Sequence, residues 1–463
     1  MFDAKVYTER RKQLKKLMKS GLILLLGNDE SPMNYTANPY HYRQDSSFLY
    51  FFGLDKPGFA ALIDVEANID YIFGEDFTID DIIWMGPQPT VKELALGVGV
   101  KETGTPGDLS DKIKEAMSKG RKIHYLPPYR HDNSLKIESL LGIKANFAKN
   151  YASVELIKAI VSLRSIKSDI EVKEIEEALD ISFEMYTIAM QMMLPGTYER
   201  EIAGRMEGIA YSYGSSTSFP IILSLHGETL HNHYHGNVLR QNNLVVIDSG
   251  AESLNHYASD ITRTFPVGGV FTDRQRDIYQ LVVDAQQTAI DAMKPGVLYR
   301  DIHLKTALVF ANGLKSIGLM KGNPEDAVKE GAHALFFPHG LGHMMGLDVH
   351  DMEDLGENYV GYDETVKRSD QFGLAYLRMG KALKPGYVLT VEPGLYFIPA
   401  LIDKWFNEKK FKNFIDFARV EEYRDFGGIR IEDNVLITND AEGHRVLGKS
   451  IPKTVDEIEA LMT

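Results

Sequence analysis

The chain has 463 residues, of which 44% are hydrophobic and 25% are charged, the ordinary balance of a soluble globular protein with two or three domains. Its net charge of -14 argues against nucleic acid or an anionic membrane as the main partner. The absence of cysteine excludes disulfides, thiolate zinc sites and cysteine nucleophiles, and it is compatible with a reducing compartment.

The N-terminal segment MFDAKVYTERRKQLKKL is charged and amphipathic, without the apolar core of a signal peptide. The first apolar run, Leu22–Leu26, is too short to span a bilayer. We therefore expect a cytoplasmic protein with no membrane partner.

The first part of the chain alternates helical patterns with short apolar runs. Tyr7 to Lys19 predicts an amphipathic helix that ends before Gly21. The runs predicted to be strands are Leu22–Leu26, Phe59–Val65, Tyr71–Phe73 and Ile123–Leu126. This alternation predicts a small α/β domain over residues 1–162.

The junction with a second domain, residues 163–463, is expected at Leu163–Asp169. Ser168 occupies the N-cap position of a long helix that reaches Met193, and Glu171 occupies the matching position of a capping box.

A segment of this second part recurs along the chain. Met193–Ile202 (MLPGTYEREI) resembles Met293–Ile302 (MKPGVLYRDI). Each copy lies between two helical stretches, and each is later followed by an apolar strand that ends in an acid, Asp248 after the first and Glu392 after the second. The pattern indicates a duplicated unit whose halves bring the acids together, with chance recurrence of a helix start as the alternative.

Five separated residues are of types that bind metal ions: Asp248, Asp260, His343, Glu392 and Glu432. The acids lie in strand-like apolar contexts, and Glu432 lies inside the run Ile429–Val435. A carboxylate in such a place is costly unless something neutralises it. A salt bridge would explain any one acid, but four acids together with a histidine indicate cations.

Charge counting favours two cations, because four carboxylates balance two divalent ions and leave room for a bridging hydroxide. Oxygen-rich donors with a single imidazole suit Mn²⁺, with Co²⁺ or Zn²⁺ as alternatives. Two ions about 3.5–4 Å apart can hold one water, lower its pKa and polarise a carbonyl oxygen.

The segment Phe337–His343 carries two histidines four residues apart, as in a helical zinc motif. Two intervening glycines disfavour a helix, and the glutamate of HExxH is absent. We expect a loop that presents His343 as a ligand and His339 near the substrate. His350 is a further candidate, since imidazoles near metals could donate to an oxyanion or shuttle a proton. A hydrogen-bonded structural role is the alternative for His339 and His350.

Three other polar residues complete the candidate site. His231, within the histidine-rich tract LHNHYH, is expected to line the substrate pocket, although such tracts are common on surfaces. Arg378 and Arg430 are fixed positive groups that could fork onto a carboxylate of a substrate or of a ligand acid, or form ordinary salt bridges.

The motifs VVIDSGA, YASDITRTF, PHGLGHMMGLDVHD, LTVEPGLYF and GGIRIED resemble those of the pita-bread metallopeptidases, and specifically of their Xaa-Pro branch, aminopeptidase P and prolidase. The resemblance extends to the N-terminal segments YRQDSSFLYFFGL and IIWMG. It implies an α/β (α+β) architecture, with a small N-terminal domain followed by a pita-bread catalytic domain that has an internal pseudo-two-fold repeat.

The resemblance also implies a dimetal site, usually manganese, on the five residues named above, and peptide substrates with proline at the second position. It implies that Glu392 assists the attacking hydroxide and that His339 and His350 contact the substrate carbonyl and the tetrahedral intermediate. His231 matches a histidine of the substrate pocket, and Arg430 matches an active-site arginine.

Trp84 matches a tryptophan that in aminopeptidase P caps the pocket of a neighbouring subunit. The resemblance therefore implies a homodimer or homotetramer.

Two features depart from the family pattern. Asp248 and Asp260 are 12 residues apart, one more than usual, which a longer hairpin tip or a bulge would absorb. The segment of 42 residues from His350 to Glu392 is prolidase-like, and its Arg378 matches an arginine that binds the dipeptide's carboxylate. An Xaa-Pro aminopeptidase is the leading prediction, prolidase is the alternative, and a non-catalytic peptide-binding module is the remote one.

Overall fold

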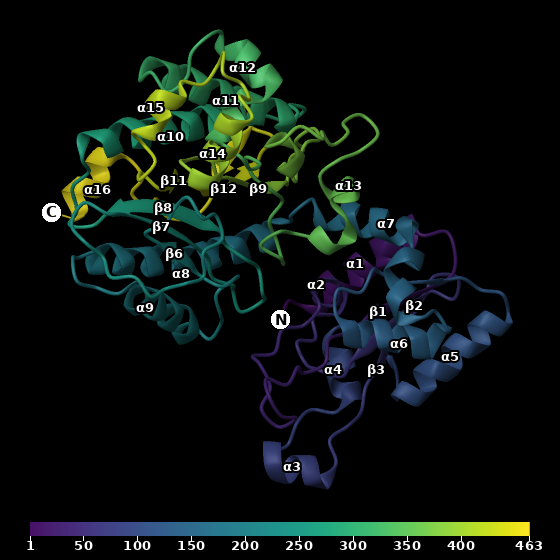
Figure 1. The fold of residues 1–463 in the computed structure, drawn as a ribbon. Helices are drawn as coiled ribbons and strands as arrows, with labels where there is room; N and C mark the ends of the chain where they lie inside the picture. The colour runs from purple at the N-terminus through teal and green to yellow at the C-terminus, as the bar shows by residue number, and fades with distance from the viewer. Residues whose placement is uncertain (463) are drawn as a thin grey trace. The chain divides into compact units, whose positions relative to one another are not determined.

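The computed structural model describes residues 1–462, which form two compact units (Figure 1). The first unit comprises Met1–Arg164 together with Met352–Tyr359, and the second comprises Ser165–Asp351 and the residues from Val360 onward. Helix α13 (Glu357–Val360) spans one of the points where the chain passes between the units. Within residues 1–462, no helix is long and apolar enough to cross a membrane.

A mixed sheet with the strand order β4-β3-β2-β1-β5 forms the centre of the first unit. Strand β2 is antiparallel to both β1 and β3, whereas the edge strands β5 and β4 run parallel to β1 and β3, respectively. Leu24, Leu62 and Phe73 pack in one buried core with Ile113. The strands are β1 (Leu22–Leu26), β2 (Ala60–Asp64), β3 (Ile69–Phe73), β4 (Glu102–Gly104) and β5 (Ile123–His124).

The helices of the first unit confirm the predicted mixture of helices and strands. The predicted N-terminal helix begins earlier, at Ala4, because Asp3 caps it, and it ends at Leu17 because Met18 is extended. Helix α3 has no buried residue, and Trp84 on it is 86% exposed. The helices are α1 (Ala4–Leu17), α2 (Ser46–Phe52), α3 (Ile79–Met85), α4 (Val91–Gly97), α5 (Pro106–Ser118), α6 (His131–Leu141) and α7 (Val154–Arg164).

The second unit places its strands between two helix pairs. Figure 1 shows β7, β8 and β12 between α8 and α9 on one side and α10 and α11 on the other. The helices are α8 (Asp169–Met192), α9 (Glu199–Ser212), α10 (Asp273–Asp291), α11 (Tyr299–Ser316), α12 (Pro324–Glu330), α14 (Pro399–Asn407), α15 (Phe417–Glu421) and α16 (Val455–Met462). Helix α8 begins with the predicted capping box, in which the N–H of Ser168 donates to Glu171 Oε2 at 3.0 Å.

Three small sheets of the second unit have the strand orders β6-β7-β8, β13-β12-β9 and β10-β11. A bridge between Thr262 and Glu432 links the first sheet to the C-terminal strands. The strands are β6 (Ile222–Ser224), β7 (Leu244–Ser249), β8 (Ile261–Pro266), β9 (Val388–Val391), β10 (Gly394–Tyr396), β11 (Gly428–Arg430), β12 (Asp433–Ile437) and β13 (His444–Val446).

The two copies of the predicted repeat make the same backbone contacts. The N–H of Gly196 donates to the carbonyl of Leu239 at 2.8 Å, and the N–H of Gly296 donates to the carbonyl of Leu383 at 2.8 Å. Each copy leads into a helix, α9 or α11, and each helix packs against the one before it. The structure therefore confirms the duplication.

The extra residue between Asp248 and Asp260 lies in a hairpin tip. Strands β7 and β8 pair from Leu244 with Pro266 onward, and a bridge between Glu252 and Ala258 keeps the same register. Within the described hairpin the register is therefore continuous, without a bulge, up to the tip. The tip is Ser253–Tyr257, in which His256 has a φ of 64°.

The strand-like run Ile429–Val435 is divided between two strands, β11 and β12. The former pairs with β10 and the latter with β9, so the chain changes partners between them. Glu432 lies at this change, where its N–H donates to the carbonyl of Thr262 at 3.0 Å. The apolar pattern of the run does not reveal this division, because hydrophobic alternation does not show which neighbour each residue pairs with.

Candidate active site

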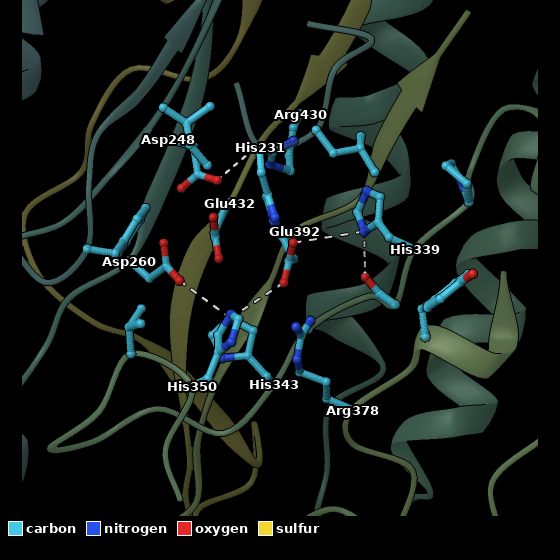
Figure 2. A pocket seen from close by; sticks show the side chains of 18 of the residues that line it. His231, Asp248, Asp260, His339, His343, His350, Arg378, Glu392, Arg430 and Glu432 are labelled. Atoms are coloured by element: carbon cyan, nitrogen blue, oxygen red, sulfur yellow. Dashed lines mark hydrogen bonds and ion pairs between the residues drawn. The ribbon is translucent and has the colours of Figure 1, made fainter. Parts of the chain in front are cut away.

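The side chains predicted to form the site all line one cavity of the second unit, with a volume of about 770 Å³ (Figure 2). Much of the remaining wall is apolar, with Phe219, Leu230, Phe372 and Leu401 among its residues. The predicted residues in the wall are His231, Asp248, Asp260, His339, His343, His350, Arg378, Glu392, Arg430 and Glu432.

Asp260, His343 and Glu432 form a compact buried group in which one potential ligand atom from each lies within 4.8 Å of the others. His343 Nε2 is 3.4 Å from Asp260 Oδ2 and 3.6 Å from Glu392 Oε1. Asp260 stands just before β8, Glu432 between β11 and β12, and Glu392 just after β9. Strand ends from both halves of the repeat thus converge on one imidazole.

The imidazole of His343 is oriented by its own loop. Its Nδ1 lies 3.0 Å from the carbonyl of Met344, so Nδ1 carries the proton and donates it. Burial lowers the pKa of His343 well below its ordinary value, so the ring is neutral. A neutral ring with its free electron pair on Nε2, directed at carboxylates, is the form that binds a metal ion.

Asp248 lies on the same wall but is held by an arginine. Arg430 Nη2 donates to Asp248 Oδ2 at 2.6 Å, and Arg430 Nε donates to the hydroxyl of Thr262 at 3.2 Å. That hydroxyl donates to Glu432 Oε2 at 2.7 Å. One buried guanidinium and one hydroxyl therefore orient two of the acids, Asp248 and Glu432.

Several carboxylate oxygens of the site lack a partner. Asp248, Asp260 and Glu432 each have a buried oxygen that accepts no hydrogen bond from any described residue. Burial and repulsion from the neighbouring acids raise the pKa values of Asp260 and Glu432 well above their ordinary range, and burial raises the pKa of Glu392 to about 7. Cations at these oxygens would offset both the cost of burying the carboxylates and the repulsion between them, so the residues fit divalent metal ions.

The segment before His343 is a loop, as predicted, and its glycines let it pass close to other backbone. A Cβ at Gly340 would lie 2.7 Å from the Cα of Leu377. The loop leaves His339 Nδ1 2.7 Å from the carbonyl of Gly340 and Nε2 2.9 Å from the hydroxyl of Tyr396. Burial lowers the pKa of His339 to about 3, so this ring is neutral as well.

The other predicted polar residues surround the carboxylates. The rings of His343 and His350 meet edge to face, with 4.2 Å between their centroids. In the view of Figure 2, His231 lies above Glu392 and Arg378 lies below it. Burial lowers the pKa of His231 from its ordinary value. The cavity therefore combines acids that suit cations with imidazoles and guanidinium groups that suit a polar substrate.

Family models match both parts of the chain. The model of metallopeptidase family M24 matches residues 173–439, more than half of the chain, and that of the aminopeptidase P N-terminal domain matches residues 7–125. The chain belongs to metallopeptidase family M24. The predicted resemblance and the pita-bread fold class are thereby confirmed, and as a metallopeptidase the M24 chain uses divalent metal.

Relatives of this M24 chain come from both activities of the Xaa-Pro branch. The human Xaa-Pro dipeptidase is 30% identical, with 98% of this chain and 91% of that protein covered. A probable Xaa-Pro aminopeptidase of Metarhizium acridum is 32% identical, with 95% and 90% covered. The chain is also similar to the structure of Escherichia coli aminopeptidase P with the inhibitor Pro-Leu, with 27% sequence identity and a TM-score of 0.81. The match covers 100% of this chain and 98% of that one. The predicted class, an Xaa-Pro metallopeptidase, is confirmed.

Two polar residues of the M24 site were missed from the sequence. The hydroxyl of Tyr396 accepts from Arg430 Nη1 at 2.8 Å and contacts His339, and the side chain of Asn434 accepts from the N–H of Asp260 at 3.1 Å. Tyr396 lies four residues after Glu392, and Asn434 lies two residues after Glu432. Glu392 and Glu432 lie outside the strands that hold Tyr396 and Asn434, so strand alternation gives no signal for either residue.

Proposed function

We propose that this M24 chain hydrolyses the peptide bond between an N-terminal residue and a following proline, using two divalent metal ions. The observation that supports this most directly is the set of buried, partnerless carboxylate oxygens beside His343 in one cavity. When bound, such ions lower the pKa of water and polarise a carbonyl oxygen. The proposed ligands are Asp248, Asp260, His343, Glu392 and Glu432, and their oxygen-rich chemistry favours Mn²⁺ over Co²⁺ or Zn²⁺.

The other polar residues take the roles of proton transfer and substrate binding. Glu392, whose Oε2 lies 3.9 Å from His339 Nδ1, would take the proton of the attacking water. His350 and His339 would contact the substrate carbonyl and stabilise the charge that develops on it. The contacts from Arg430 through the hydroxyl of Tyr396 to His339 Nε2 hold that imidazole in one orientation.

Proline specificity follows from the chemistry of the bond. An Xaa-Pro bond is a tertiary amide that has no N–H, and the ring fixes φ. A site that acts on the carbonyl does not need that N–H. The apolar part of the wall, which includes Phe219 and Leu230 beside His231, would hold the proline ring.

The test is hydrolysis of Gly-Pro and of Gly-Pro-Pro, each with added Mn²⁺ and with chelator. Efficient cleavage of the tripeptide would support an Xaa-Pro aminopeptidase, our first candidate. Cleavage of the dipeptide alone would support prolidase, the second candidate, which Arg378 in the cavity wall favours. No metal-dependent cleavage of either peptide would overturn the proposal in favour of a non-catalytic peptide-binding module.

Arg378→Met separates the two candidates further. If Arg378 binds the carboxylate of a dipeptide, its loss should raise the KM for Gly-Pro about 10- to 100-fold, as expected for a charged hydrogen bond of 1.5–3 kcal/mol. Gly-Pro-Pro-amide, which has no carboxylate, should be affected much less. Lys404→Met is the matched control, because Lys404 lines the same cavity but its side chain is 64% exposed. Equal changes for both substrates would refute this role of Arg378.

We also propose a homodimer or homotetramer in which Trp84 contributes to the contact between subunits. Trp84 is 86% exposed, and its neighbours Ile79 and Ile83 on α3 are 74% and 70% exposed, a surface that typically marks an interaction site. Trp84→Ala should shift the sedimentation coefficient toward that of the monomer, whereas Leu135→Ala on α6 should not. A wild-type chain that is monomeric at all concentrations would contradict this proposal. The cytoplasmic location remains a prediction of the composition.

A further inference from the structure

A buried ion pair lies outside the cavity. Lys167 Nζ is 2.8 Å from Asp351 Oδ2, and each side chain is 1% exposed. Neither residue lines the cavity, and neither belongs to the proposed ligands. Lys167 stands just before α8, and Asp351 directly follows His350.

The pair is a poor way to stabilise the fold. Removing two charges from water costs much of what their attraction returns, and well-packed apolar residues of similar volume commonly serve stability equally well. Breaking such a pair on one side is harmful, because the remaining charge is then buried alone. We therefore ask which segments the pair joins and how it positions them.

One of these segments is the loop that carries both His343 and His350. The N–H of Asp351 donates to the carbonyl of Met344 at 2.9 Å, so the two ends of the loop are joined. The N–H of Asp348 donates to Asp351 Oδ1 at 3.4 Å. The Asp351 carboxylate thus contacts the loop with one oxygen and Lys167 with the other.

The other segment, which contains Lys167, connects the loop to the sheet that contains β12. The N–H of Lys167 donates to the carbonyl of Gly386 at 2.8 Å, and the N–H of Gly386 donates to Ile437 of β12 at 2.9 Å. A Cβ at Gly346 would lie 2.7 Å from Asp351 Oδ2 and 2.9 Å from Lys167 Cε. The loop therefore packs directly on the pair, with no space for a larger residue.

We propose that Lys167 and Asp351 are positioning residues that fix the His350 imidazole edge to face against His343 in the cavity wall. Asp351 is covalently next to His350, and Lys167 fixes Asp351 to β12 through Gly386. This inference rests on the proposed function only in assigning His350 a role in peptide hydrolysis. The placement of the ring itself can be tested without catalysis.

The test uses Asp351→Asn and the double variant Lys167→Met/Asp351→Leu. Both should lower kcat on the peptide that the wild type cleaves by about 10- to 100-fold, the usual cost of losing a residue that orients an active-site imidazole. The double variant should recover the melting temperature but not kcat. Recovery of kcat together with stability would show a merely structural pair and would overturn the proposal.

A second arm asks whether the effect passes through His350. In a His350→Ala background the same double substitution should lower kcat no further. An equal additional loss in that background would overturn the proposal. Asp70→Asn is the matched control, since it removes the partner of buried Arg11 in the first unit, and kcat should be unchanged.

A third arm does not depend on catalysis. Diethyl pyrocarbonate should modify His350 faster in the double variant than in the wild type, as followed by mass spectrometry with the more exposed His226 as the reference. An unchanged rate would overturn the positioning role. If the wild type cleaves no peptide, the proposed function fails, and this arm still decides the inference. If the double variant has low stability, Lys167→Arg is measured in its place.

Discussion

Replacing Asp260 with alanine is expected to lower metal-dependent kcat/KM on Xaa-Pro peptides by at least about 10³-fold. Metal ions supply several kcal/mol of transition-state stabilisation, and each 1.36 kcal/mol is worth tenfold in rate. Asp260 Oδ2 lies 3.4 Å from His343 Nε2, and Asp260 belongs to the compact buried group with Glu432, so the variant removes a central donor. Steady-state rates at saturating Mn²⁺ and the metal content of the purified protein would measure the effect.

The matched control for this substitution is Asp180→Ala. Asp180 is a half-exposed acid of α8 that pairs with Lys449 at 3.3 Å, and it is not one of the proposed ligands. Its loss should leave rate and metal content unchanged. Full metal-dependent cleavage by the Asp260→Ala protein would show that the metal ions are held by other residues.

Removal of the metal ions is expected to lower the melting temperature by roughly 5 °C or more. A ligand that binds only the folded state adds about 2.7 kcal/mol of stability at a hundredfold excess over its Kd. Without cations, Asp260, Glu392 and Glu432 must take up protons, because burial and mutual repulsion raise their pKa values. Scanning calorimetry of the Mn²⁺-loaded and the fully chelated protein would measure the difference.

This difference should widen as the pH rises. Burial raises the pKa of Glu392 from 4.5 to about 7. A carboxyl group whose pKa is higher in the folded than in the unfolded state contributes stability below the unfolded value of 4.5, and that contribution is lost as the pH rises through 7. The two pKa values correspond to about 3 kcal/mol of stability lost by the chelated protein.

Titrating groups outside the proposed metal ligands act in both the loaded and the chelated protein, so their contributions cancel in the comparison. Burial opposes ionisation of Asp433, but the charges of Arg263 and Lys453 prevail and lower its pKa. Its contribution is therefore lost as the pH falls, with or without metal. Equal melting curves for the Mn²⁺-loaded and the fully chelated protein would contradict a metal centre built from these acids. So would a difference between their melting temperatures that narrows toward neutral pH.

Much of the fold could be predicted because the strands are short apolar runs with clear ends. Leu22–Leu26 has the predicted bounds, and the apolar strand predicted before Glu392 is β9, Val388–Val391. The change of partners at Ile431 and Glu432 could not be predicted, because hydrophobic alternation continues through it. Pairing between strands far apart in the chain is decided by tertiary packing, which local patterns do not encode.

The sequence was sufficient to predict which residues lie together, since every side chain predicted for the site lines the cavity. What the sequence did not show is how these residues are held. Arg430 was expected to bind either a substrate or a ligand acid, and the structure pairs it with Asp248 at 2.6 Å. Tyr396 and Asn434 escaped notice because a buried tyrosine or asparagine in a strand usually indicates packing, and only their contacts distinguish them.

The bridge between Thr262 and Glu432 joins residues 170 positions apart in the chain. A nascent chain that already contains Asp248 and Asp260 therefore lacks one of the proposed ligands until the segment with Glu432 has been translated. That segment must also pair with β9 and β8, a long-range step that forms late because it closes a large loop. If these residues hold the metal ions as proposed, metal capture requires completion of the second unit.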